Sequence, residues 1–136
     1  MDPTTPAEQI LLGDEAVARG AIDAGISAAY AYPGTPSTEI FQTIQAQARA
    51  LGLPVQGLWS ANEKVALEEG VGVSYAGRRA LVAMKHVGLN VAADPFMNVA
   101  VSGTPFRSIR CRARKTGPGS HTASRRENRR RWSKVC

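Results

Sequence analysis

The sequence has few cysteines, few aromatic residues and no long apolar run. Its two cysteines, Cys111 and Cys136, form no CxxC pair and have no metal-ligand spacing with His86 or His121. We therefore expect no metal site, cluster or disulfide framework. No apolar run approaches the roughly 18 residues of a membrane span, and the first nine residues contain neither a basic leader nor an apolar signal core. These absences predict a cytoplasmic protein without a membrane partner.

Acidic residues are scarce in only one part of the chain. Residues 1–103 carry six Lys/Arg and ten Asp/Glu, a net charge of −4, whereas residues 104–136 carry eleven Lys/Arg and the single acid Glu127, a net charge of +10. The formal total of +6 thus hides two unlike segments. The second segment also lacks apolar periodicity, so we expect 104–136 to be a disordered basic tail.

The abrupt change after Gly103, where nine arginines follow within 33 residues, leads to a hypothesis about the tail's origin. An out-of-frame translation of a GC-rich gene would produce such a composition. One of the other two reading frames would then encode an apolar strand followed by an acidic, Asp-containing loop.

Apolar spacing and turn residues predict helices alternating with strands between residues 10 and 103. This alternation is typical of an α/β domain with a parallel sheet and helices on both faces. Ligands of such sheets bind at the carboxyl ends of the strands, where the loops 33–37, 60–63 and 85–90 are expected. The predicted helices span about 14–25, 36–52, 63–76 and 91–101, and the predicted strands 27–32, 54–59 and 79–85.

Two residues at predicted helix starts have two interpretations each. Glu63 has the capping-box spacing from Ser60, or it is a functional carboxylate at the end of a strand. Thr35 caps a helix that begins at Pro36, or its hydroxyl contacts an anionic ligand. Spacing alone favours the capping role in both cases.

Other polar and glycine positions are less specific. Lys85 and His86 lie at the end of a predicted apolar strand. They are either a solvated strand end or part of an anion site. The stretch GVGVSYAG misses the GxGxxG spacing of a nucleotide site and is placed within a helix, which favours close helix packing. Core packing is the expected role of Trp59, Met84 and Met97.

Three segments together resemble the N-terminal domain of indolepyruvate:ferredoxin oxidoreductase alpha subunits. They are LLGDEAVARGAIDAG (11–25), AYPGTPSTEI (31–40) and WSANEKVALEEGVGVSYAGRRALVAMKHVGLNVAADP (59–95). Gly34 and the KHVGLN stretch separate this type from the related pyruvate and 2-oxoglutarate enzymes. The resemblance implies that residues 10–103 form part of a pyrimidine-binding domain for thiamine diphosphate.

The resemblance also implies roles for particular residues. Glu63 stands where the family's glutamate hydrogen-bonds N1′ of the aminopyrimidine, a contact that helps to activate the cofactor, and Asn62 lies beside it. Thr35 stands where the family contacts the carboxylate of the 2-oxoacid. The same substrate pocket is expected to include Lys85, His86 and Asn90.

By this resemblance, the full-length family carries out oxidative decarboxylation of aryl 2-oxoacids to acyl-CoA, with ferredoxin as acceptor and a beta subunit as partner. Family members also hold Mg²⁺ and 4Fe–4S clusters, whose ligands this sequence lacks. We therefore expect a truncated alpha subunit that is inactive as an isolated chain.

Two alternatives compete with this interpretation. The RRENRRRW block could bind nucleic acid by neutralising phosphates, although arginine runs are usually solvated, so no nucleic-acid partner is expected. Another thiamine-diphosphate 2-oxoacid decarboxylase would share the glutamate. The YPGTPS and KHVGLN stretches disfavour it.

Overall fold

Short helices and strands alternate in the computed structural model, which describes residues 10–35 and 37–103. The chain divides into two units, Met1–Pro105 and Phe106–Cys136, and all described residues belong to the first. The predicted tail, 104–136, and Pro36 lie outside the described residues. In chain order the elements are α1 (Gly13–Asp23), β1 (Ala28–Ala31), α2 (Thr38–Ala50), β2 (Gln56–Trp59), α3 (Glu63–Tyr75), β3 (Ala80–Ala83), α4 (Gly88–Val91) and α5 (Ala93–Ser102).

The three strands form one parallel sheet in the order β2-β1-β3. Ala31, the last residue of β1, pairs with Trp59 of β2 and with Ala83 of β3, so the carboxyl ends of all three strands lie at one edge. The central strand β1 is buried throughout, as its small and apolar sequence requires. The predicted α/β class with a parallel sheet is confirmed.

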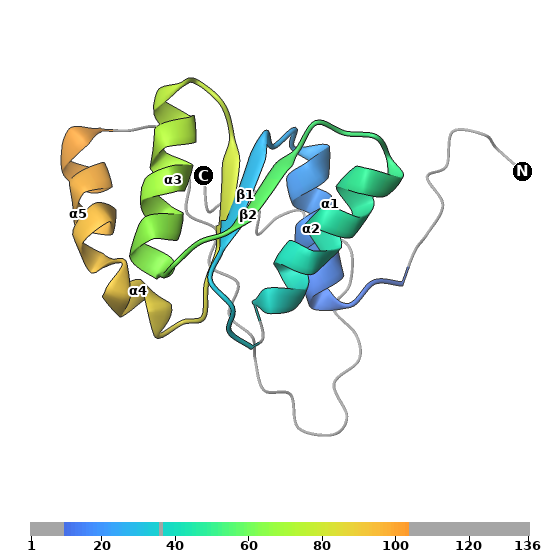
Figure 1. Cartoon of the computed structure of the whole chain (residues 1–136), viewed down its shortest axis with the longest axis horizontal. Helices are drawn as coiled ribbons and strands as arrows, with labels where there is room; N and C mark the ends of the chain where they lie inside the picture. The colour runs from blue at the N-terminus through green and yellow to red at the C-terminus, as the bar shows by residue number, and fades with distance from the viewer. Residues whose placement is uncertain (1–9, 36, 104–136) are drawn as a thin grey trace, which may run out of the picture. The chain divides into compact units, whose positions relative to one another are not determined.

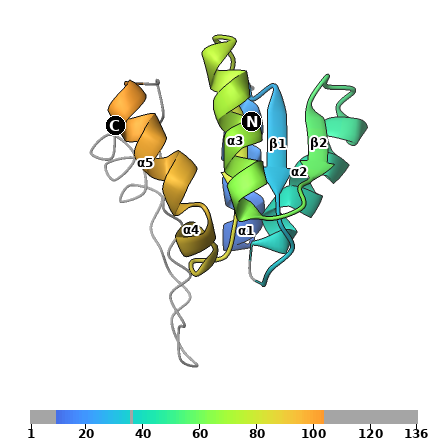
Figure 2. The ribbon, with the colours of Figure 1, turned by 60° about the vertical axis from the view of Figure 1, so that its left-hand side comes forward.

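Helices cover both faces of the sheet (Figures 1 and 2). On one face α1 and α2 pack on β1 around Phe41 and Ile44, the largest fully buried side chains among the described residues. On the other face α3 packs on β1 and β3 through Ala66, and α5 packs on α3 through Val99 and Leu67. Within residues 10–35 and 37–103, no helix has the length and apolar character that crossing a membrane requires.

Glycine and aromatic residues make close contacts between the helices and the sheet. A Cβ added to Gly70 would lie 2.5 Å from Cγ2 of Val82, which confirms close packing of α3 on the sheet. Trp59 packs its ring on Phe41, with the ring centroids 4.3 Å apart, and Met84 contacts the core. Met97 is 62% exposed, so its predicted core role is wrong: α5 packs through Pro95 and Val99 instead.

Candidate functional site

Three loops meet at the edge where the parallel strands end. They are the β1–α2 loop, the β2–α3 loop and the β3–α4 loop. The Ser60 N–H donates to the carbonyl of Ala31 at 2.8 Å, which joins the second loop to the end of β1. A Cβ added to Gly34 would touch the Lys85 side chain at 3.4 Å, so the first and third loops are also neighbours.

The β1–α2 loop is held by short hydrogen bonds around Gly34. Its N–H donates to Oγ1 of Thr38 at 2.9 Å, and its carbonyl accepts from the N–H and the hydroxyl of Ser37, both at 2.8 Å. The predicted cap at Thr35 is therefore wrong: α2 begins at Thr38, with Ser37 in the N-cap position. Thr35 is exposed, and its side chain makes no hydrogen bond with the described residues.

The β2–α3 loop places Glu63 as the first residue of α3. The predicted capping box from Ser60 is wrong, because Asn62 is the N-cap and its Oδ1 accepts from the N–H of Val65 at 3.0 Å. Ser60 is buried and donates its hydroxyl to Oε2 of Glu69 instead. With the cap made by Asn62, the carboxylate of Glu63 is not used to begin the helix.

The β3–α4 loop lies against Glu63. A Cβ added to Gly88 would come within 2.6 Å of both Cγ and Oε1 of Glu63, so the side chain of Glu63 packs on the Gly88 backbone. Gly88 is buried and Glu63 is half-buried. No local sequence pattern signals this contact, which joins residues 25 positions apart.

The remaining predicted site residues lie in or next to the same loop. Lys85, His86 and Asn90 are exposed. The Gly88 N–H donates to the carbonyl of Lys85 at 2.8 Å, and the Asn90 N–H donates to the carbonyl of Val87 at 3.1 Å. The structure thus brings the loops of Thr35, Glu63 and Lys85 to one edge, with the polar side chains of the third loop facing solvent.

Charged groups near this edge are unevenly placed. The first turns of α1 and α2 carry Asp14 and Glu39. Burial, followed by the charge of Glu39, raises the pKa of the Asp14 carboxyl above its usual range.

Beside the site, Lys64 bridges α3 and α5 by pairing with Asp94 at 2.8 Å, and it also lies 3.9 Å from Glu68. Lys64 is therefore engaged with acids other than its neighbour Glu63.

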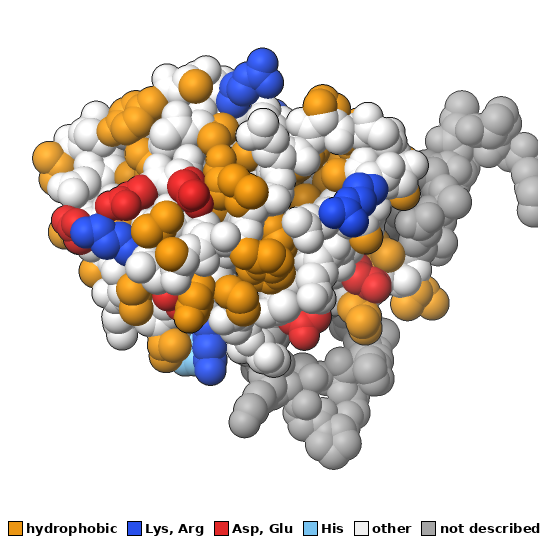
Figure 3. Space-filling view, in the orientation of Figure 1, with side chains coloured by type: hydrophobic (Ala, Val, Ile, Leu, Met, Phe, Trp, Pro, Cys, Tyr) orange, Lys and Arg blue, Asp and Glu red, His pale blue; other side chains and the backbone are white. Residues whose placement is uncertain are grey.

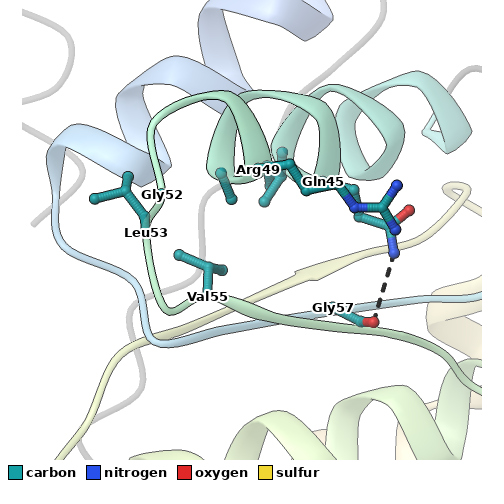
Figure 4. Close-up of a pocket in the computed structure, with 8 residues that line it drawn as sticks. Gln45, Arg49, Gly52, Leu53, Val55 and Gly57 are labelled. Carbon is teal, nitrogen blue, oxygen red and sulfur yellow. Dashed lines mark hydrogen bonds between the residues drawn. The ribbon is translucent and has the colours of Figure 1, made fainter.

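Two hollows lie away from the loop edge. One, of about 190 Å³, lies between α2 and β2, where Gln45 Nε2 donates to the Gly57 carbonyl at 3.5 Å (Figure 4). The other, of about 360 Å³, is lined by α3 and α5, including Val71 and Val99. The described residues contain no group of three His, Cys, Asp or Glu placed to hold a metal ion.

No protein-family model matches the chain, but several curated proteins are similar to it. Indolepyruvate oxidoreductase subunit IorA of Archaeoglobus fulgidus is 46% identical over 128 residues, which are 93% of this chain and 20% of that protein. The subunits of the same name from Pyrococcus abyssi and Pyrococcus horikoshii are each 50% identical over 99 residues, 72% of this chain and 15% of each relative. The chain thus spans a fifth or less of the length of these relatives. It is a homologue of the N-terminal part of indolepyruvate oxidoreductase subunit IorA.

Proposed function

We propose that residues 10–103 are the pyrimidine-side half-site of an indolepyruvate-type 2-oxoacid:ferredoxin oxidoreductase that uses thiamine diphosphate. The observation that carries the proposal is the position of Glu63: a half-buried carboxylate, not used for helix capping, at the edge where three loops meet. The names of the relatives support the reaction class. Parallel α/β sheets also bind ligands at this edge.

The chemistry of the residues fits the aminopyrimidine of the cofactor. Glu63 offers a carboxylate acceptor for a protonated ring nitrogen, and its side chain packs on the buried backbone of Gly88. The Oδ1 of Asn62 accepts the hydrogen bond that caps α3, and its amide N–H groups can serve as donors. When bound, thiamine diphosphate supplies the nucleophilic carbon that attacks the 2-oxoacid carbonyl.

Each residue of the half-site then has a task. Glu63 shares a proton with the ring nitrogen and orients the ring, and the partly buried setting strengthens that hydrogen bond. Lys85 provides positive charge for the carboxylate of an aryl 2-oxoacid, and the exposed side chains of His86, Thr35 and Asn90 provide hydrogen-bond donors.

The rest of the reaction lies outside this chain in the proposal. The relatives are at least five times longer than the matched segment, as the 20% and 15% coverages state. We assign the Mg²⁺ site that holds the diphosphate, the 4Fe–4S clusters, the coenzyme A and ferredoxin contacts and the beta-subunit interface to such additional polypeptide. The 136-residue chain alone is then inactive.

A chimaeric enzyme tests the proposal. Residues 10–103 replace the matching segment of the Archaeoglobus fulgidus subunit, and indolepyruvate-dependent reduction of ferredoxin is assayed. Loss of a proton-sharing carboxylate typically costs about 10²- to 10⁴-fold in kcat, so Glu63→Gln is expected to have that effect. The matched control is Glu68→Gln on the same helix, whose exposed carboxylate lies 3.9 Å from Lys64. Retained activity in Glu63→Gln, or a folded but inactive chimaera, would contradict the proposal.

A further inference from the structure

Gly88 lies where the β3–α4 loop passes closest to Glu63. A Cβ built on Gly88 would be 2.6 Å from Cγ, 2.6 Å from Oε1 and 2.9 Å from Cδ of Glu63. Real Cβ atoms do not tolerate such distances, and the atoms met include the middle of the Glu63 side chain as well as its tip. Any residue larger than glycine at position 88 therefore displaces the Glu63 carboxylate or shifts α4.

Backbone conformation does not explain the glycine at this position. The described glycines with positive φ are Gly25, Gly52, Gly77 and Gly103, and Gly88 is not among them. Gly88 is instead a residue of α4, where alanine has the better helix propensity. The space needed by Glu63 is the reason that the structure provides.

We infer that Gly88 is a positioning residue, whose missing side chain leaves the space in which the Glu63 carboxylate lies. The Gly88 N–H is bonded to the Lys85 carbonyl, so the loop that carries Lys85 and His86 also limits where Glu63 can point. The contact stands on the geometry alone, whereas its effect on catalysis rests on the proposed function. A shift of the loop that carries Lys85 and His86 would therefore also move the Glu63 carboxylate.

Carbon-13 NMR of the complete 136-residue chain tests the contact. The carboxyl resonance of Glu63 is assigned by its absence from the spectrum of Glu63→Gln. Gly88→Ala is expected to move this resonance. The matched control Gly72→Ala, at an exposed position of α3 with nothing within 4 Å of an added Cβ, is expected to leave it in place. An unmoved Glu63 resonance in folded Gly88→Ala would overturn the inference.

A double-mutant cycle covers the case in which Gly88→Ala folds poorly. Alanine at position 88 is expected to lower the melting temperature when Glu63 is present, and not when Glu63→Ala has removed the clashing atoms. Restored folding of the double variant supports the inference. Equal losses in both backgrounds would overturn it, because the clash would then be with another group.

The chimaeric enzyme separates positioning from a purely structural effect. Small misplacements of catalytic groups cost on the order of 100-fold in rate, so Gly88→Ala is expected to lower kcat by about that factor with little change in KM for the 2-oxoacid. The double variant Glu63→Gln, Gly88→Ala should lose no more activity than Glu63→Gln alone. If Glu63→Gln keeps full activity, the proposed function fails, and the NMR and melting results still decide the role of Gly88.

Discussion

Asn62 ends the loop after β2 and determines where α3 begins. Its backbone is extended, with φ −162° and ψ 177°, and its Oδ1 accepts from the Val65 N–H at 3.0 Å. Removing such a cap costs about 1 kcal/mol, so Asn62→Ala is expected to lower the free energy of unfolding by that amount in urea titrations. Asn62→Asp keeps the acceptor oxygen and should retain most of the stability. Equal losses in both variants would mean that the oxygen is not the stabilising group.

At the residue scale, the sequence predicts which loops meet at the carboxyl edge of the sheet better than it predicts which residues cap the helices. Thr35 and Ser60 are predicted to cap helices, but the N-cap positions are held by Ser37 and Asn62, each two residues further along the chain. Local spacing cannot decide between neighbouring hydroxyl and amide side chains, since each can reach the same N–H groups. The contact of Glu63 with Gly88 depends on the packing of α4 beside α3, which no local pattern encodes.

Gly70 is the point of closest approach between α3 and β3. An added Cβ would lie 2.5 Å from Cγ2 of Val82 and 4.0 Å from the Cβ of Ala80. Overpacking typically costs about 1–3 kcal/mol, so Gly70→Ala is expected to destabilise the protein despite the better helix propensity of alanine. Gly72→Ala, one half-turn away on the exposed side, should instead stabilise by up to about 1 kcal/mol. Chemical denaturation of both variants measures the contrast, and effects of the same sign would contradict the packing of α3.

Lys64 and Asp94 connect α3 to α5 in a pH-dependent way. The hydrogen bond from Lys64, and then its charge, lower the pKa of the Asp94 carboxyl below 3.8. A lowered pKa contributes stability that is present above pH 3.8 and is lost as the pH falls through the lowered value. The free energy of unfolding of the unsubstituted chain should therefore exceed that of Asp94→Asn above pH 3.8, and the difference should disappear as the pH falls through the lowered pKa of Asp94. Because the pair is exposed, the effect is small and is weakened by salt.

Urea titrations at low salt, from pH 6 to pH 2, measure this difference. An advantage over Asp94→Asn that stays constant across the range would show that the ion pair does not link the two helices.

At the element scale, glycine stop signals and apolar spacing predicted the helices and strands in the right order. Gly25 and Gly52 adopt φ values of 73° and 62° just after α1 and α2, as stop signals should. The strands are shorter than predicted, four residues each. The sequence predicts a loop over 85–90 and one helix over 91–101, whereas the structure has the short helix α4 at Gly88–Val91 and begins α5 at Ala93, next to the Asp94-Pro95 pair.

At the scale of the described domain, one edge strand remains open to solvent. Along β2, Leu58 is 54% exposed and Trp59 is 41% exposed. Figure 3 shows the molecule from the same side as Figure 1, and hydrophobic side chains lie in the middle of that view with charged side chains around them. The strand order β2-β1-β3 depends on pairing between strands that are far apart in the chain and separated by helices, so the sequence could predict a parallel sheet but not which strand lies at its centre. That order also makes neighbours of the loops that follow β1 and β3, which carry Gly34 and Lys85.

The described residues end at position 103, and this gives a prediction for the whole chain. The core clusters of the described residues draw only on positions between 17 and 99, and α5 ends at Ser102. Removing residues 104–136 is therefore expected to change the melting temperature by less than about 3 °C, since 1 kcal/mol shifts a domain of this size by about 4–8 °C. Calorimetry of the chain ending at 103, beside the full chain, measures this change. A drop of more than about 8 °C would mean that residues 104–136 support the fold, and it would contradict their interpretation as an out-of-frame extension.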